Sequence, residues 1–154
     1  MKLKALSLIL ALGGACPALA APVVAENPQA IAGLLKDIGY RAELTKDDTG
    51  DPKIESAAAG VNFSIYFYGC TDGKACSSIQ FSSGFDLDSA LNMSSVNDWN
   101  TRKRYGKVYI DDEGDPYLEM DINLAGGGIT EDSFRDSLDS WERLLSDFQE
   151  HIDW

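Results

Sequence analysis

Apolar residues recur at helical spacing near both ends of the chain. Asn27 precedes Pro28, which suits the cap and first position of a helix, and Gly39 follows as a stop signal. Thr130 is placed to cap a second, longer helix, with two acidic residues after it near the positive end of the helix dipole. The apolar stripes consist of Ile31, Leu34, Leu35 and Ile38 in the first helix and of Phe134, Leu138, Trp141, Leu145, Phe148 and Ile152 in the second. The chain is therefore predicted to begin and end its fold with amphipathic helices.

Between these helices, apolar and polar residues alternate as they do in half-buried strands. The predicted strands are 41–47, 52–58, 61–68, 76–81, 105–110 and 118–124. A further helix is expected at 86–104, with Leu91, Val96 and Trp99 as its inward residues. The order α-β-β-β-β-α-β-β-α indicates an α+β fold, an antiparallel sheet with packed helices.

The first twenty residues have the three parts of a secretory signal peptide. MKLK is positively charged, ALSLILALGGA is apolar but too short to span a bilayer, and Ala18-Leu19-Ala20 is a small-x-small cleavage site. Lipoprotein processing at Cys16 is the alternative, although Gly13 stands where such signals carry Leu. We expect cleavage after Ala20, a lead-in segment at 21–26, a single domain at 27–154, and a periplasmic or secreted protein.

The net charge of the chain limits the classes of partner that it is expected to bind. There are 25 acidic and 13 basic residues, a net charge of −12, and loss of Lys2 and Lys4 with the leader makes it more negative. This charge opposes binding to nucleic acid or to an anionic membrane, and it favours cationic partners or divalent ions. No stretch after the leader is long and apolar enough for stable membrane insertion.

Two cysteines follow the leader, Cys70 and Cys76. The turn-like TDGKA between them separates strand-like runs, so a hairpin would bring the two sulfur atoms together. Exported proteins meet oxidising conditions, which favours a structural disulfide. The alternative is a redox site, but such sites usually have Cys-x-x-Cys spacing at a helix N-terminus.

The same acidic phrase occurs twice, as DDTGDPKIE from Asp47 and DDEGDPYLE from Asp111. Asp side chains bond to nearby backbone, Gly accepts positive φ and Pro fixes φ, so both phrases are typical of hairpin turns. Calcium binding is the alternative, because calcium takes six to eight oxygen ligands. Neither phrase has the EF-hand pattern, and one turn alone would make a weak site, whereas two converging turns would make a stronger one. The candidate ligands are Asp47, Asp51, Asp111 and Asp115.

One basic cluster stands out, formed by Arg102, Lys103, Arg104 and Lys107. Cations at a helix end are stabilised by the carbonyl dipole, which is the structural interpretation. The alternative is a docking patch for an acidic partner. Because Trp and Arg are common among binding hot spots, Trp99, Arg102, Lys103 and Arg104 are the candidate partner contacts.

The sequence offers little for catalysis. His151 is the one histidine, three residues from the C-terminus, where we expect it to be solvated. A Ser-His-Asp triad and a histidine-rich metal site are thereby disfavoured. No nucleotide-binding fingerprint is present, and no pair of carboxylates stands out. We expect no catalytic residues and no cofactor, and an enzyme working on carboxylates alone is the third hypothesis.

The segment VNDWNTRKRYGKVYIDDEGDPYLEMDINLAGGGITEDSF resembles the central motif of YbjN-domain proteins, and the YGC…C hairpin is similar to exported members. The resemblance implies a fold similar to type III secretion chaperones, an α+β sandwich that dimerises and binds extended partner segments. It also implies a role in regulating sensory transduction, and it supplies no catalytic residues. The matching positions are Asn97, Trp99, Asn100, Arg104, Tyr105, Gly114, Asp115, Pro116, Glu119, Asp121 and Trp141.

The leading hypothesis is thus an exported, non-catalytic protein-binding or regulatory module of the YbjN type. Its partner is an unidentified protein or a second copy of the chain. A calcium sensor using the acidic turns is the second hypothesis.

Overall fold

The computed structural model describes residues 21–154, so the predicted signal peptide and Cys16 lie outside the described residues. The elements are α1 (Pro28–Asp37), β1 (Glu43–Lys46), β2 (Pro52–Ala58), β3 (Val61–Tyr68), β4 (Ser78–Gly84), α2 (Met93–Arg102), β5 (Lys107–Ile110), β6 (Pro116–Asn123) and α3 (Glu131–His151). All six strands form one sheet, in which neighbouring strands are antiparallel. This confirms the predicted α+β class and the predicted order of elements.

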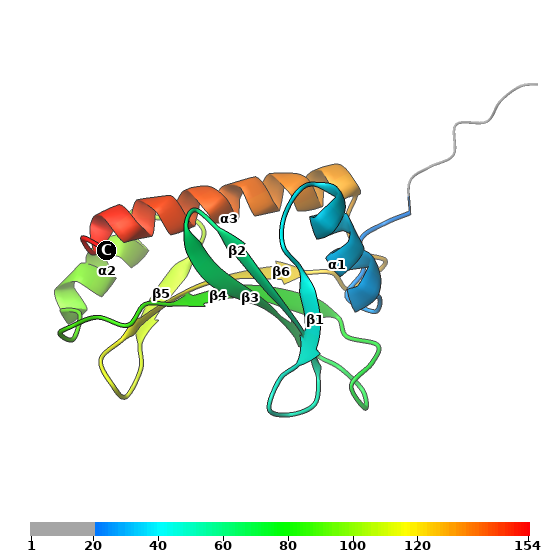
Figure 1. Cartoon of the computed structure of the whole chain (residues 1–154), viewed down its shortest axis with the longest axis horizontal. Helices are drawn as coiled ribbons and strands as arrows, with labels where there is room; N and C mark the ends of the chain where they lie inside the picture. Colours follow the sequence, from blue (N-terminus) through cyan, green and yellow to red (C-terminus); the bar gives the residue numbers. More distant parts are fainter. Residues whose placement is uncertain (1–20) are drawn as a thin grey trace, which may run out of the picture.

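The strand order across the sheet is β1-β2-β3-β4-β6-β5, so β1 and β5 form the edges. Strand β4 pairs with β6, and β5 folds back on the outer side of β6. Figure 1 shows α3 running along one side of the sheet, while the β1–β2 and β5–β6 turns extend to the other side. The sheet therefore has one helix-covered face and one face turned away from the helices.

Helix α3 covers the core. Every residue of its predicted stripe up to Phe148 is buried, and Ile152 is half-buried. The Trp141 ring lies 5.6 Å from the Phe81 ring and 5.9 Å from the Phe63 ring, centroid to centroid. Because α3 contributes three of the largest buried aromatic side chains, Phe134, Trp141 and Phe148, it supplies much of the apolar burial that stabilises the sheet.

The second helix is shorter than predicted, since α2 begins at Met93 with Asn92 as its cap. The preceding residues are held by the β5–β6 turn. The Leu87 N–H donates to Asp115 Oδ1 at 3.0 Å, and the Leu91 N–H donates to the carbonyl of Gly114 at 3.2 Å. These tertiary hydrogen bonds fix residues 86–92 in a non-helical path, so the predicted start at residue 86 was wrong.

The lead-in segment is tied to the domain. Val23 pairs with Ile129 in an isolated antiparallel bridge and is buried. Gly128 makes the close approach possible: its φ is +79°, and a Cβ atom there would lie 2.1 Å from the carbonyl oxygen of Val23. The chain is thereby anchored from its first described residues. Within residues 21–154, no helix combines the length and the hydrophobicity needed to cross a bilayer.

Candidate binding face

The face of the sheet opposite the helices is covered by no element of residues 21–154 (Figure 1). Its side chains come from the strand positions that alternate with the core, and we call it the open face. Among the residues that form it are Glu43, Thr45, Lys53, Glu55, Ser64, Tyr66, Tyr68, Gln80, Ser82, Lys107, Tyr109, Tyr117, Glu119 and Asp121.

The register of the strands determines where the open face carries large side chains and where it is hollow. Tyr66 lies opposite Lys53 on one side and Gln80 on the other. In the next row Ser64 lies opposite Ser82, and both side chains are small. The result is a hollow of about 470 Å³ lined in part by Tyr66, Tyr117 and these two serines.

Tyr109 and Tyr117 form an aromatic platform at the β5 edge of the open face. They are opposite each other in the β5–β6 register, and their rings are stacked with centroids 5.4 Å apart and planes 13° from parallel. Gly84 makes room for the platform, because a Cβ atom there would lie 2.8 Å from the Tyr117 ring. A flat aromatic surface is therefore built into the sheet by three strands.

Polar contacts orient the neighbouring side chains. The Tyr68 hydroxyl donates to Gln80 Oε1 at 3.2 Å, and Gln80 Nε2 donates to Asp121 Oδ1 at 2.8 Å. Lys107 forms an ion pair with Glu119 at 3.1 Å and lies 3.9 Å from Asp121. The side chain of Asp121 is 63% exposed, so its carboxylate is available to a ligand.

Tyr68, Tyr109 and Tyr117 stay protonated at neutral pH, because the fold raises the pKa of each. Burial and the negative charge of Glu119 raise the pKa of Tyr109 to about 12. Burial and Glu119 also raise the pKa of Tyr68, and burial and Asp111 raise that of Tyr117. The hydrogen bond to Glu119 raises the pKa of Lys107. The open face thus presents neutral phenols, charged lysines and carboxylates.

Both acidic phrases form hairpin turns of the same construction, which confirms their structural interpretation. Asp47 Oδ1 accepts hydrogen bonds from the backbone N–H groups of Thr49 and Asp51, both at 2.9 Å. Asp111 Oδ1 accepts the corresponding bonds from Glu113 and Asp115, also at 2.9 Å. Although burial acts in the opposite direction, the hydrogen bonds from Thr49, Asp51 and Gly50 hold the pKa of Asp47 below its usual value.

The structure does not bring the four candidate metal ligands together. The Asp47 turn lies beside the disulfide loop, where a Cβ atom at Gly73 would be 3.2 Å from the carbonyl of Gly50. The Asp111 turn instead contacts Ala90 and Leu91, at the other end and the other edge of the sheet. Among residues 21–154, no group of three or more His, Cys, Asp or Glu side chains is arranged to hold a metal ion.

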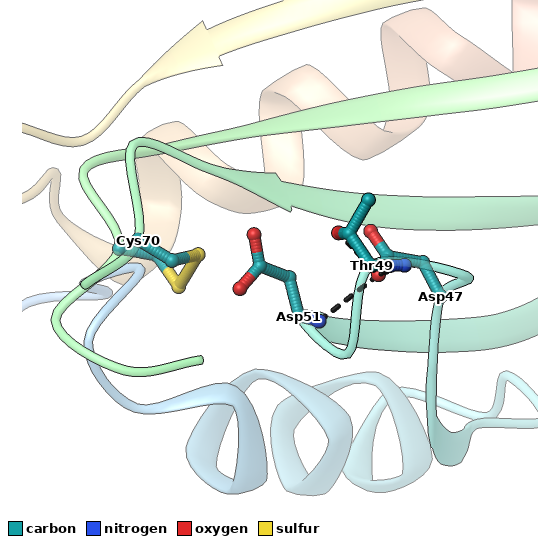
Figure 2. The surroundings of a disulfide bond; sticks show 5 residues. Asp47, Thr49, Asp51 and Cys70 are labelled. Atoms are coloured by element: carbon teal, nitrogen blue, oxygen red, sulfur yellow. Dashed lines mark hydrogen bonds between the residues drawn. A yellow bond between two sulfur atoms is a disulfide. The ribbon is translucent and has the colours of Figure 1, made fainter. Parts of the chain in front are cut away.

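Cys70 and Cys76 form a disulfide that closes the β3–β4 loop. Cys76 is buried against the core, whereas Cys70 is half-buried. Figure 2 shows Asp51 on the side of its turn that faces this disulfide. The bond therefore fixes a loop that supports the first acidic turn.

The candidate partner contacts from the sequence have different environments. Trp99 is only 2% exposed, and its Nε1 donates to the carbonyl of Gly106 at 3.0 Å, so it has a structural role. Lys103 covers the Trp99 ring at 4.9 Å and pairs with Asp147. Arg102 pairs with Asp98 at 2.9 Å and Arg104 lies 5.7 Å from the Tyr105 ring, both exposed. These cations lie around the end of α2. Lys103 and Arg104 also line a pocket that reaches Lys107, Glu119 and Asp121 at the border of the open face.

His151 was expected to be solvated, but the structure packs it against α2. Its Nε2 lies 2.9 Å from Ser95 Oγ and 3.1 Å from the Ser95 carbonyl, and its ring lies 5.4 Å from the Trp99 ring. It joins the end of α3 to α2 and lies apart from the open face.

A family model for YbjN, described as a putative bacterial sensory transduction regulator, matches residues 27–154. Searches of curated proteins and of solved structures give no match.

Proposed function

Because this chain belongs to the YbjN family of regulatory or binding modules, we propose that it is an exported, non-catalytic module that holds a partner protein on its open face. The observation that carries the proposal is a six-stranded sheet face without a covering element in the described chain and with large aromatic side chains at its surface. Tyr68 is 45% exposed and Tyr109 is 42% exposed. Tyrosine is enriched in protein interfaces, because a rigid ring with a polar tip gives contact area at little entropic cost.

Two further features support parts of the proposal. The leader-like sequence of residues 1–20 and the Cys70–Cys76 disulfide favour export to an oxidising compartment. His151, the single histidine of the chain, is engaged by Ser95 away from the open face, which favours binding over histidine-based catalysis.

The proposal is tested by photo-cross-linking in the host cell. Benzoylphenylalanine replaces Tyr66 or Tyr109 on the open face, and in the matched control it replaces the exposed Arg143 on α3. We expect both open-face positions to form the same covalent adduct with one protein and the α3 position to form none. The adduct is identified by mass spectrometry of the cross-linked peptide.

An adduct with a second copy of this chain would show that the open face binds by self-association. Loss of adducts at both open-face positions, or equal capture at Arg143, would refute the open face as the binding site.

A further inference from the structure

The cations of the open face are already neutralised. Lys53 lies 2.9 Å from Glu55, and Lys107 lies 3.1 Å from Glu119. At the border of the face, Arg41 donates to Asn62 Oδ1 at 3.0 Å and lines the same hollow. A ligand that reaches the middle of this face therefore meets lysines that are already paired. Two cations without a carboxylate within 4.0 Å in the described chain, Arg41 and Arg104, lie at its border.

Negative charge, by contrast, is left over at two corners of the open face. The β1–β2 turn carries Asp48 and the β5–β6 turn carries Asp112 and Glu113, all exposed, and none has a cation within 4.0 Å among the described residues. Both turns extend to the side of the sheet that faces away from α3 (Figure 1). Their charge reaches the tyrosines, since Asp47 contributes to the raised pKa of Tyr68 and Asp111 to that of Tyr117.

We propose that the open face binds an extended partner segment rich in arginine or lysine, which crosses the tyrosines from one acidic turn to the other. This inference rests on the proposed function, and it specifies the chemistry of the partner.

Each component of the open face suits such a segment. Tyrosine rings attract cations placed over them, and a native example is Lys53, whose Nζ lies 5.8 Å from the Tyr66 ring centroid. The acidic turns and Asp121 offer carboxylates for charge-assisted hydrogen bonds. Six strands about 4.8 Å apart make a sheet roughly 24 Å wide, which about seven extended residues would cross. The diagonal between the two turns, at opposite ends of the sheet, would take about ten.

The same charges disfavour other occupants. A second copy of this chain would bring its own acidic turns against these, and nucleic acid would bring phosphates. The cationic segment is the occupant whose charge complements the open face.

The test uses the mature protein and two fluorescent nine-residue peptides, one alternating arginine with threonine and the other alternating glutamate with threonine. Affinity is measured by fluorescence anisotropy, and the site is mapped by chemical-shift changes of backbone amides. The open-face variant is Asp48→Asn/Asp112→Asn. Its matched control is Asp136→Asn/Asp139→Asn, which removes the same charge from exposed positions of α3.

We expect only the arginine peptide to bind and to shift the amides of Tyr66, Tyr109 and Asp121. The open-face variant should weaken binding by up to about fivefold per carboxylate removed, the upper range for an exposed ion pair. The α3 variant should change it far less.

No binding of the arginine peptide, equal weakening by the two variants, or shifts confined to α3 would overturn the inference. Cross-linking of a neutral or acidic partner segment at Tyr66 and Tyr109 would overturn it too, while leaving the proposed function intact. If cross-linking finds no partner but the peptide experiment succeeds, the proposed function fails and the chemistry of the face stands.

Discussion

The side chain of Asn100 closes the free edge of β5 by bonding to both backbone groups of Val108. Asn100 Nδ2 donates to the Val108 carbonyl at 3.0 Å, and the Val108 N–H donates to Asn100 Oδ1 at 2.9 Å. An uncovered edge strand is a template for pairing with another chain, and here an amide side chain occupies that position.

Replacing Asn100 should therefore have two effects. In Asn100→Ala, loss of two hydrogen bonds of about 0.5–1.5 kcal/mol each should lower the free energy of unfolding by roughly 1–3 kcal/mol. The exposed β5 edge should also increase self-association. Urea denaturation and sedimentation velocity measure the two effects. Asn97→Ala, at an exposed position of the same helix, is the control, and an equal loss in both variants would contradict the role of Asn100.

Substitutions at Asp47 distinguish a structural role of its carboxylate from a role in binding a metal ion. Asp47→Asn keeps the Oδ1 acceptor for Thr49 and Asp51, so it should be nearly as stable as the natural protein. Asp47→Ala removes the acceptor and should lower stability by about 1–2 kcal/mol. Millimolar calcium should leave the melting temperature unchanged. A calcium-dependent rise that Asp47→Asn abolishes would instead support the calcium-sensor hypothesis.

Stability should fall at high pH because of tyrosine ionisation. The folded state raises the pKa of Tyr109 to about 12, and burial and Glu142 raise that of Tyr40 to about 12, from 10.0. Between pH 10 and pH 12 the unfolded chain loses these protons first, so the free energy of unfolding decreases as pH rises through this window. Tyr109→Phe and Tyr40→Phe should each flatten the decrease in denaturation curves measured from pH 9 to pH 12. Unchanged slopes in both variants would contradict the assignment.

Removing the disulfide should destabilise the protein modestly, because the closed loop is short. Cys70→Ser/Cys76→Ser should lower the free energy of unfolding by about 2 kcal/mol, since the unfolded chain regains little freedom. A reducing agent should lower the melting temperature of the natural protein and leave that of the variant unchanged. The same response in both would show that the disulfide is absent from the protein in solution.

The proposed export makes a prediction about the N-terminus. Protein isolated from the host envelope should begin at Ala21, and it should be found in the soluble envelope fraction. Mass spectrometry of the intact protein measures the terminus. A lipid-modified N-terminal Cys16 would establish the lipoprotein alternative, and a retained Met1 would argue against cleavage.

Local sequence patterns were sufficient to predict the elements that depend on residues close together in the sequence. The stripe from Phe134 to Phe148 and the Asp-Gly turns follow from spacing and turn chemistry. The start of α2 depends on Asp115 binding Leu87 across the fold, and no local pattern contains that contact. The residues that form the open face were missed for a similar reason. The alternation within 61–68 separates Tyr66 from the apolar residues of its strand, but only the register places Tyr117 beside Tyr109 and over Gly84.

The position of α3 at the end of the chain has a consequence for biogenesis. Strands β1–β4 are synthesised first, yet the apolar face that they present is covered by α3, whose aromatic residues follow all six strands in the sequence. A nascent chain lacking them has no cover for Phe63 and Phe81, so it cannot complete its core. The cover for Phe63 and Phe81 is therefore available only once α3 has been synthesised, and a chain made only as far as β6 keeps this apolar face exposed.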